Sequence, residues 1–172
     1  NLMAACVLTG SDLDALRQDL RSAADSIEAY LDDMEDRVSQ LDRVLGDFSA
    51  LIVVGRGTSM GAVWNGALIN KESAKYPLEG LNAAEFRHGP LELAAPGFTA
   101  LVLAGDQTAG LNRKLAQDIN RHGGRAVWID TVPDPNLETF LMPRTEGRAR
   151  PLGEILPLQL LTLVLAARND VI

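Results

Sequence analysis

The sequence contains very little cysteine and histidine, with one cysteine, Cys6, and two histidines among 172 residues. A single cysteine cannot form an internal disulfide bond, and so few thiol and imidazole groups leave no cluster at the spacing of a zinc site. We therefore expect no metal and no cofactor. The scarcity of cysteine also makes the cytoplasm the expected location.

The sequence also lacks a basic cluster, and its formal net charge is −7. Binding to a nucleic-acid backbone needs a basic face, so DNA and RNA are not expected partners. The strongest apolar run, residues 155–167, is interrupted by Pro157 and Gln159 and is shorter than the ~20 residues that span a bilayer. We interpret it as a core-facing helix. The segment that begins at Asn1 has neither the basic start nor the apolar core of a signal peptide, so no membrane contact is expected.

What the sequence does contain is typical of a folded α/β protein. The apolar fraction is 47%, and acidic and basic residues are mixed along the chain. A chain of 172 residues is long enough for one domain with a substantial core. We predict a helical lead-in over residues 1–48 and one α/β domain over residues 49–172.

The lead-in has the apolar spacing of helices. Ser11 followed by Asp14 is typical of an N-cap with an acidic first turn, and apolar residues recur three or four positions apart over residues 13–45. The pattern fits one long helix, or two helices broken near residues 32–33, ended by Gly46. We interpret the apolar side as a packing face rather than as a coiled-coil partner site.

After residue 50 the pattern changes to short apolar runs separated by helical stretches, which predicts a doubly wound parallel sheet of five strands with helices on both faces. The predicted strands are Leu51–Val54, Ala74–Leu78, Thr99–Leu103, Arg125–Ile129 and Thr139–Met142. The predicted helices are Ser59–Lys71, Ala83–Arg87, Ala109–His122 and Gly153–Arg168. Ligands of such folds bind at the carboxyl ends of the strands, where this prediction places Gly55, Gly80 and Gly105.

The segment Gly55-Arg56-Gly57-Thr58-Ser59 follows a predicted buried strand and opens a predicted helix. Free backbone N–H groups and the helix dipole at such a turn can receive an anion, and two hydroxyls add donors. The segment lacks the third glycine of a dinucleotide fingerprint and the lysine of a P-loop. It is therefore either a phosphate-binding loop or a tight turn capped by Thr58 or Ser59.

Two further residues have the chemistry of proton transfer. Glu72 ends an apolar, small-residue helix, where a partly desolvated carboxylate could serve as a general base; the alternative is a surface glutamate paired with Lys71 or Lys75. His88 stands in a predicted loop and could exchange protons near neutral pH, or could cap a helix. Loop, carboxylate and imidazole would all lie within one αβ unit and act on a phosphorylated small molecule.

These segments together resemble a known family. Residues 55–57 (Gly-Arg-Gly), 66–72 (Gly-Ala-Leu-x-x-Lys-Glu), 84–90 (Ala-Glu-x-x-His-Gly-Pro) and 157–161 (Pro-Leu-Gln-Leu-Leu) are similar to motifs of the second sugar isomerase (SIS) domain of double-SIS proteins. That group includes the isomerase half of glucosamine-6-phosphate synthase and the amino-sugar phosphate deaminases and isomerases. The resemblance covers about residues 51–170 and implies a flavodoxin-like three-layer sandwich.

The resemblance implies rearrangement of a hexose 6-phosphate between aldose and ketose forms, with or without loss of ammonia from an amino sugar. The family's glutamate, matched by Glu72, moves a proton between C1 and C2, and its histidine, matched by His88, assists ring opening. A sugar phosphate, a second copy of the chain in a homodimer and the first SIS domain are the implied partners. Residues 1–10 look like the end of that preceding domain, so this chain would hold half of an active site.

The chain also departs from the synthase pattern. Ile69 stands where the synthase has a lysine and Asn65 where it has a glutamate, and the catalytic lysine of the family's C-terminal tail has no match before Ile172. A deaminase or isomerase therefore fits better than a synthase. Two other roles stay open. Single SIS domains serve as sugar-phosphate sensors in regulatory proteins, which would need the loop but not Glu72 with His88, and a degenerate SIS domain could act only in dimerisation.

Overall fold

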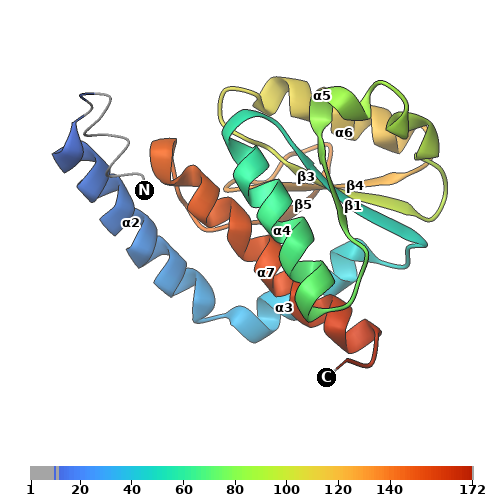
Figure 1. Cartoon of the computed structure of the whole chain (residues 1–172), viewed down its shortest axis with the longest axis horizontal. Coiled ribbons are helices and arrows are strands. Elements are labelled where there is room, and N and C mark those ends of the chain that lie inside the picture. The colour runs from blue at the N-terminus through green and yellow to red at the C-terminus, as the bar shows by residue number, and fades with distance from the viewer. Residues whose placement is uncertain (1–9, 11, 172) are drawn as a thin grey trace.

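The computed structural model describes Gly10 and residues 12–171, and its centre is a five-stranded parallel sheet with the strand order β2-β1-β3-β4-β5 (Figure 1). The strands are β1 (Ala50–Gly55), β2 (Glu79–Asn82), β3 (Phe98–Leu103), β4 (Arg125–Asp130) and β5 (Glu138–Leu141). All four strand pairs are parallel. This confirms the predicted α/β class and the flavodoxin-like arrangement.

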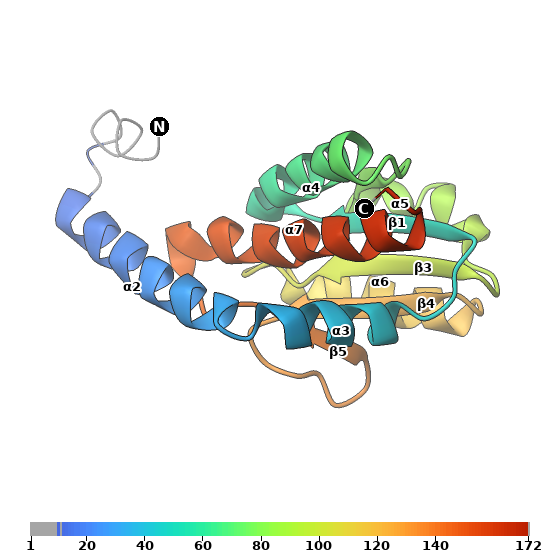
Figure 2. The same cartoon turned by 90° about the horizontal axis from the view of Figure 1, so that it is seen from below.

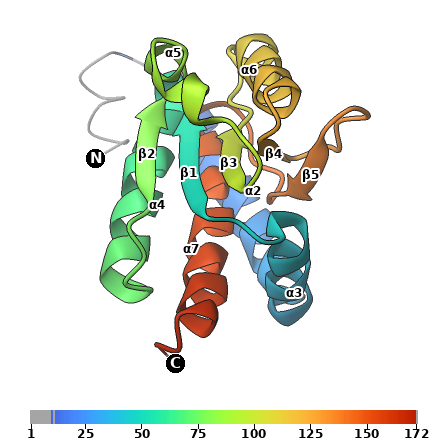
Figure 3. The ribbon, with the colours of Figure 1, turned by 90° about the vertical axis from the view of Figure 1, so that its right-hand side faces the viewer.

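Helices cover both faces of the sheet (Figure 3). The α-helices are α2 (Leu13–Leu31), α3 (Met34–Leu45), α4 (Met60–Ser73), α5 (Ala83–Phe86), α6 (Ala109–Arg121) and α7 (Arg150–Arg168). The 3₁₀-helices are η1 (Gly57–Ser59), η2 (Pro90–Leu93) and η3 (Gly147–Ala149). The helices α3, α4 and α7 pack on one face, while α5 and α6 pack on the other.

The alternation of side chains along the central strands explains the two layers. In β1, Leu51 and Val53 belong to the core that contains α4 and α7, whereas Ile52 and Val54 belong to the core that contains α5 and α6. Successive side chains of a strand point to opposite faces, so a strand that is apolar throughout needs a cover on each side. The sheet therefore separates two hydrophobic cores.

The lead-in forms two helices that break at residues 32–33, which is one of the two predicted forms (Figure 2). Ser11, the predicted N-cap, lies outside the described residues, and Asp12 caps α2 by accepting hydrogen bonds from the N–H groups of residues 14 and 15. Gly46 ends α3 with φ +59°, as predicted. The α3 helix packs along α7, and Arg168 joins them by donating to Asp42 Oδ1 at 2.7 Å.

The prediction of the second strand was wrong. Residues 74–78 form the connection that follows α4, and β2 begins only at Glu79. Ala74 and Leu78 are fully buried because they fill the core beneath this connection, so their apolar character does not reflect a strand. Gly80 accordingly lies inside β2 rather than after a strand. The other four strands lie within one residue of their predicted positions.

The C-terminal helix is the core helix that the sequence predicted. The segment Gly147–Arg168 is long and apolar enough to cross a membrane by length and composition, but 67% of its most apolar window is buried inside the fold. Pro157 lies within α7 and is itself buried. The apolar residues of this helix are therefore accounted for by packing against α3, α4 and the sheet.

Gly66 allows α4 and α7 to approach closely. A Cβ at residue 66 would lie 2.8 Å from Leu158 Cβ, which is shorter than real Cβ contacts. Asn70, one turn further along α4, donates from Nδ2 to the carbonyls of Gly66 at 2.9 Å and Leu158 at 3.0 Å. The pair of helices is thus held by a glycine contact and a buried amide.

We expect Gly66→Ala to lower the free energy of unfolding by up to about 2 kcal/mol, because the ~1 kcal/mol that alanine gains in a helix offsets only part of an overpacking cost of about 1–3 kcal/mol. Gly61→Ala is the matched control, since nothing lies within 4 Å of a Cβ at that position of the same helix. It should raise stability by about 0.5–1 kcal/mol. Urea denaturation measures both, and the same sign for the two variants would contradict the close contact.

Candidate functional site

A pocket of about 410 Å³ opens at the carboxyl ends of the central strands. Three loops line it: Arg56–Thr58 after β1, Asp106–Thr108 after β3, and Gly147–Arg148 before α7. The chain leaves β1 through α4 on one face of the sheet and leaves β3 through α6 on the other. The pocket therefore lies at the topological switch point, which is where doubly wound folds bind ligands.

Backbone geometry brings these loops together. Gly57 and Gly105 have φ values of +62° and +69°, which favour glycine. A Cβ at residue 105 would also clash with Thr108 Oγ1, at 2.5 Å. Asn112 is fully buried and fixes the end of β3 by donating from Nδ2 to the carbonyls of Leu103 and Ala104, at 3.0 and 3.1 Å. The backbone conformations of Gly57 and Gly105 thus set the course of two of the loops at the pocket.

The alternative that Ser59 caps the helix is not what the structure shows. Ser59 occupies the N-cap position of α4 without a side-chain cap, and its buried Oγ donates to Glu154 Oε1 at 2.9 Å. The segment Arg56–Thr58 borders the pocket, whereas Gly55 and Ser59 are buried beneath it. Of the five residues predicted for phosphate binding, the middle three therefore reach the pocket wall.

A buried charged network supports the loop from below. Arg150 donates from Nε to Glu154 Oε1 at 3.1 Å and from Nη2 to Asp130 Oδ1 at 2.8 Å. Burial raises the pKa of Glu154, and the hydrogen bonds and charges of Ser59 and Arg150 only partly oppose this. Glu154 Oε2 has no hydrogen-bond partner. Sequence reasoning missed this network, although an arginine and a glutamate four residues apart in an otherwise apolar helix were a usable signal.

Glu72 lies far from this pocket. It is exposed in the last turn of α4, toward the amino ends of the strands, whereas the loop after β1 lies at their carboxyl ends. The prediction that the carboxylate of Glu72 is partly desolvated is therefore wrong for a single copy of this chain. The ion-pair alternative is also not formed, since Lys75 Nζ donates to the backbone carbonyl of Glu72 at 2.7 Å and neither Lys71 nor Lys75 forms an ion pair with its carboxylate.

Lys75 shapes the connection that follows α4, three residues after Glu72. Its φ of +53° lies in the left-handed region, and the N–H of Tyr76 donates to Asn70 O at 3.3 Å to close the helix end. A side chain is strained in this conformation and glycine is not. We expect Lys75→Gly to be more stable than Lys75→Ala by about 1 kcal/mol, because both lose the lysine hydrogen bond but only glycine relieves the strain. Thermal denaturation of the two variants measures the difference; equal stabilities would contradict it.

His88 lies on the other side of the sheet. It is exposed two residues after the end of α5, and its neighbour Arg87 forms an ion pair of 2.7 Å with Asp118 of α6. Helices α5 and α6 cover one face of the sheet and α4 the other (Figure 3). The sheet therefore lies between His88, which follows α5, and Glu72 of α4. Loop, carboxylate and imidazole were expected within one unit, and one chain does not bring them together.

The outer face of α4 exposes two large apolar side chains on the turns before Glu72. Trp64 is 63% exposed and Leu68 is 52% exposed. Asn65, Ile69 and Glu72 follow one another at helical spacing beside them, and of these only Ile69 is partly covered. Exposed apolar residues gathered on one helix face are typical of an interaction surface.

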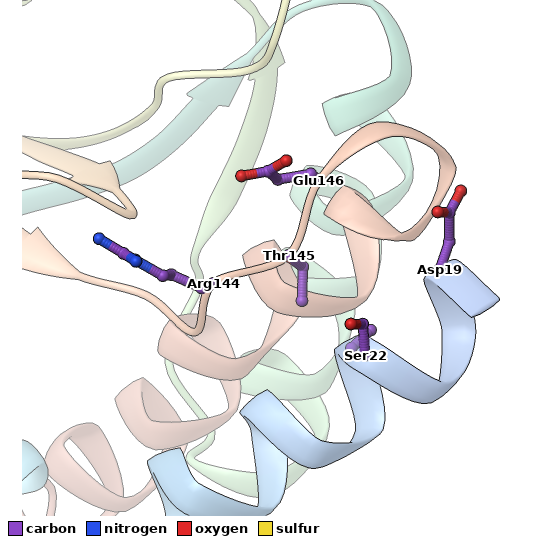
Figure 4. Close-up of a pocket in the computed structure, with 6 residues that line it drawn as sticks. Asp19, Ser22, Arg144, Thr145 and Glu146 are labelled. Atoms are coloured by element: carbon purple, nitrogen blue, oxygen red, sulfur yellow. The ribbon is translucent and has the colours of Figure 1, made fainter.

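A second pocket, of about 280 Å³, lies between α2 and the loop before α7 (Figure 4). Asp19 and Ser22 come from α2, while Arg144, Thr145 and Glu146 come from the loop. The side chains of Arg144 and Glu146 extend away from Asp19, so no set of polar groups converges there. Within the described part of the chain, no group of three or more His, Cys, Asp or Glu side chains could hold a metal ion.

Comparison with known proteins relates the chain to phosphosugar enzymes. No protein-family model matches it. It is 27% identical over 166 residues to the glutamine–fructose-6-phosphate aminotransferase (isomerizing) of Corynebacterium diphtheriae, covering 91% of this chain and 27% of that protein. With the protein of the same name from Rhizobium leguminosarum bv. viciae it shares 28% over 161 residues, covering 90% and 26%. The chain thus spans about a quarter of the length of these relatives.

Solved structures of the same fold belong to related proteins. The C-terminal domain of glucosamine-fructose-6-phosphate aminotransferase from Francisella tularensis superposes with a TM-score of 0.80 at 21% identity, covering 98% of this chain and 50% of that one. Tagatose-6-phosphate ketose/aldose isomerase from Escherichia coli gives 0.69 at 19% (90% and 44%). Glucosamine-6-phosphate deaminase from Thermotoga maritima gives 0.68 at 16% (96% and 48%). The fold is therefore the SIS type of α/β fold, as the sequence motifs predicted.

Proposed function

We propose that this chain, which is homologous to isomerizing aminotransferases over about 90% of its length, is the phosphosugar-binding half-domain of an isomerase or an amino-sugar 6-phosphate deaminase. The observation that carries the proposal is this homology together with the retention of Lys71-Glu72 and His88-Gly89-Pro90 at the spacing of the family motifs. The cytoplasm is the proposed location, and no cofactor is needed.

Glu72 is proposed as the base that moves a proton between C1 and C2 of the open-chain sugar. Proton abstraction next to a carbonyl or imine needs a positioned carboxylate within hydrogen-bond reach of the proton. The carboxylate of Glu72 is exposed and free of ion pairs, so it is available to a substrate. A partner that covers Trp64 and Leu68 would also exclude water from the neighbourhood of Glu72.

His88 is proposed to assist ring opening by giving and taking a proton. Since the sheet lies between His88 and Glu72 of one chain, both can act on one substrate only if His88 comes from another copy. We therefore include a homodimer in the proposal. The exposed apolar face of α4 supports a covering partner there, and a preceding SIS domain of the same protein is the proposed occupant.

Isomerisation or deamination is favoured over amide transfer. Asn65 and Ile69 precede Glu72 by seven and three residues, so they lie on the same side of α4 as the proposed base. Any substrate at Glu72 would meet an amide and an aliphatic side chain there, where the synthase pattern has two charged groups. The pattern of charge around the sugar therefore differs from that of the synthase.

The test is proton exchange by the full-length protein in D₂O. NMR of glucosamine 6-phosphate and fructose 6-phosphate should show deuterium at C1 or C2, and release of ammonia would identify the deaminase. The alternative is a regulatory domain that senses a sugar phosphate without chemistry. Absence of exchange together with thermal stabilisation by either sugar phosphate would contradict the enzyme and support the sensor.

A further inference from the structure

Arg56 lines the pocket at the carboxyl ends of β1 and β3 and has no acidic partner among the described residues. Its Nε atom is buried with no hydrogen-bond partner, and among residues 12–171 its guanidinium forms no ion pair, although it is part of the wall of the pocket at the carboxyl ends of β1 and β3. Charged groups that lose contact with water are normally paired or hydrogen-bonded. An arginine in a pocket wall without an ion pair is therefore a candidate position for binding an anion.

The rest of the pocket suits an anion. Arg148 brings a second guanidinium to the wall, Thr58 and Thr108 bring hydroxyl groups, and Asp106 is the one acidic residue among those lining the pocket. Arginine and hydroxyl donors are the groups that bind phosphate oxygens in proteins. The pocket volume of about 410 Å³ leaves room for a phosphate group and the small molecule attached to it.

Three long helices also begin around this pocket. The loops that line it lead directly into α4, α6 and α7, and none of these helices has a side-chain cap at its N-cap residue. The N–H groups of Met60, Ala109 and Arg150 already donate to carbonyls of the preceding turns, but the helix dipole still places partial positive charge at that end of each helix. The backbone thus adds to the positive character that the two arginines provide.

The pocket cannot hold the phosphate of a sugar that reacts at Glu72 of the same chain. Twelve residues of helix separate Met60 from Glu72, which at the rise of an α-helix is about 18 Å. A hexose 6-phosphate extended from C1 to phosphorus spans about 9 Å at ordinary bond lengths. An anion in this pocket is therefore a different molecule from a substrate at the proposed base.

We propose that this pocket is a second site, separate from the Glu72 surface, that binds a phosphate monoester through Arg56. The chemical class is a small phosphorylated metabolite with its phosphate against Arg56, Thr58 and the N-terminus of α4. That this site is a second one rests on the proposed role of Glu72, whereas binding of phosphate through Arg56 does not.

The test is calorimetric titration of inorganic phosphate and of fructose 6-phosphate into the full-length protein. Arg56→Gln should weaken phosphate binding at least tenfold, because it removes a charge-assisted pair of hydrogen bonds. Arg56→Lys, which keeps the charge but not the planar fork, should give an intermediate affinity. Arg43→Gln removes the same charge from an exposed position on α3 and should leave the affinity for inorganic phosphate unchanged.

The outcomes separate this proposal from the proposed activity. Phosphate binding that is undetectable at millimolar concentration, or equal in wild-type and Arg56→Gln proteins of equal thermal stability, would overturn the second site. Loss of all fructose 6-phosphate binding in Arg56→Gln would show that the pocket is the sugar's single site and would also overturn it. Deuterium exchange without Arg56-dependent phosphate binding would support the proposed activity and overturn the second site. Arg56-dependent phosphate binding without deuterium exchange would support phosphate binding at Arg56 and contradict the proposed activity.

Discussion

Replacing Glu72 by glutamine is expected to lower the rate of deuterium exchange at C1 or C2 of the sugar phosphate by about 10²–10⁴-fold, the usual contribution of a general base. Glutamine keeps the size and the hydrogen-bonding oxygen of the side chain but cannot accept the proton. Because Glu72 is exposed and makes no ion pair, the change should leave the fold intact. NMR in D₂O measures the exchange, and thermal denaturation checks the fold.

Glu28→Gln is the matched control for this variant, since Glu28 is an exposed glutamate on α2. It should exchange protons at the wild-type rate. An exchange rate of Glu72→Gln close to that of Glu28→Gln would exclude Glu72 as the base. An enzyme that keeps exchange but loses only ammonia release would instead assign Glu72 to a later step.

The second large effect is expected at Arg150. We expect Arg150→Met to lower the free energy of unfolding by about 3–5 kcal/mol, because it leaves the buried carboxylates of Asp130 and Glu154 without their shared cation. Arg150 lowers the pKa of Glu154 by its charge, so in the variant this pKa rises further above the usual 4.5. A carboxyl group with a raised pKa in the folded state loses stability as the pH rises, so the deficit of the variant should grow from acid to neutral pH. Urea denaturation at several pH values measures it.

Arg121→Met is the control for Arg150→Met. Arg121 also pairs with an aspartate, Asp118, but its side chain is 72% exposed, so its removal should cost no more than about 1 kcal/mol. The double variant Arg150→Met with Glu154→Met removes two members of the buried network. It should be more stable than the sum of the single changes predicts. Simple additivity would show that the two side chains act independently and would contradict the network.

Most of the fold could be predicted from the sequence because its signals are local. The strands β1, β3 and β4 are buried on both faces, and their continuous apolar runs can be recognised as strands in the sequence. The second strand could not be found in this way. Its residues, Glu-Gly-Leu-Asn, are only partly buried at the sheet edge, whereas the preceding connection carries the buried Ala74 and Leu78. Apolar residues that are buried in a loop look the same in the sequence as apolar residues that are buried in a strand. Only the three-dimensional structure distinguishes the two.

The site shows where local reasoning ends. The position of the Arg56–Thr58 loop at the carboxyl edge follows from the strand and helix on either side of it, and the structure places it at the pocket. The separation of Glu72 from His88 depends on which face of the sheet each helix covers, and that is a property of the whole topology. Residues close together in sequence were therefore expected to share a site, although the sheet divides them.

The packing of α3 along α7 joins two segments that are made at very different times during synthesis. The buried residues Leu41 and Leu45 of α3 leave the ribosome more than a hundred residues before the helix that covers them. Until α7 emerges, the buried side of α3 and the part of the sheet face that α7 covers stay exposed. A chain released before residue 150 would therefore present a wide apolar surface to chaperones and proteases rather than a smaller folded domain.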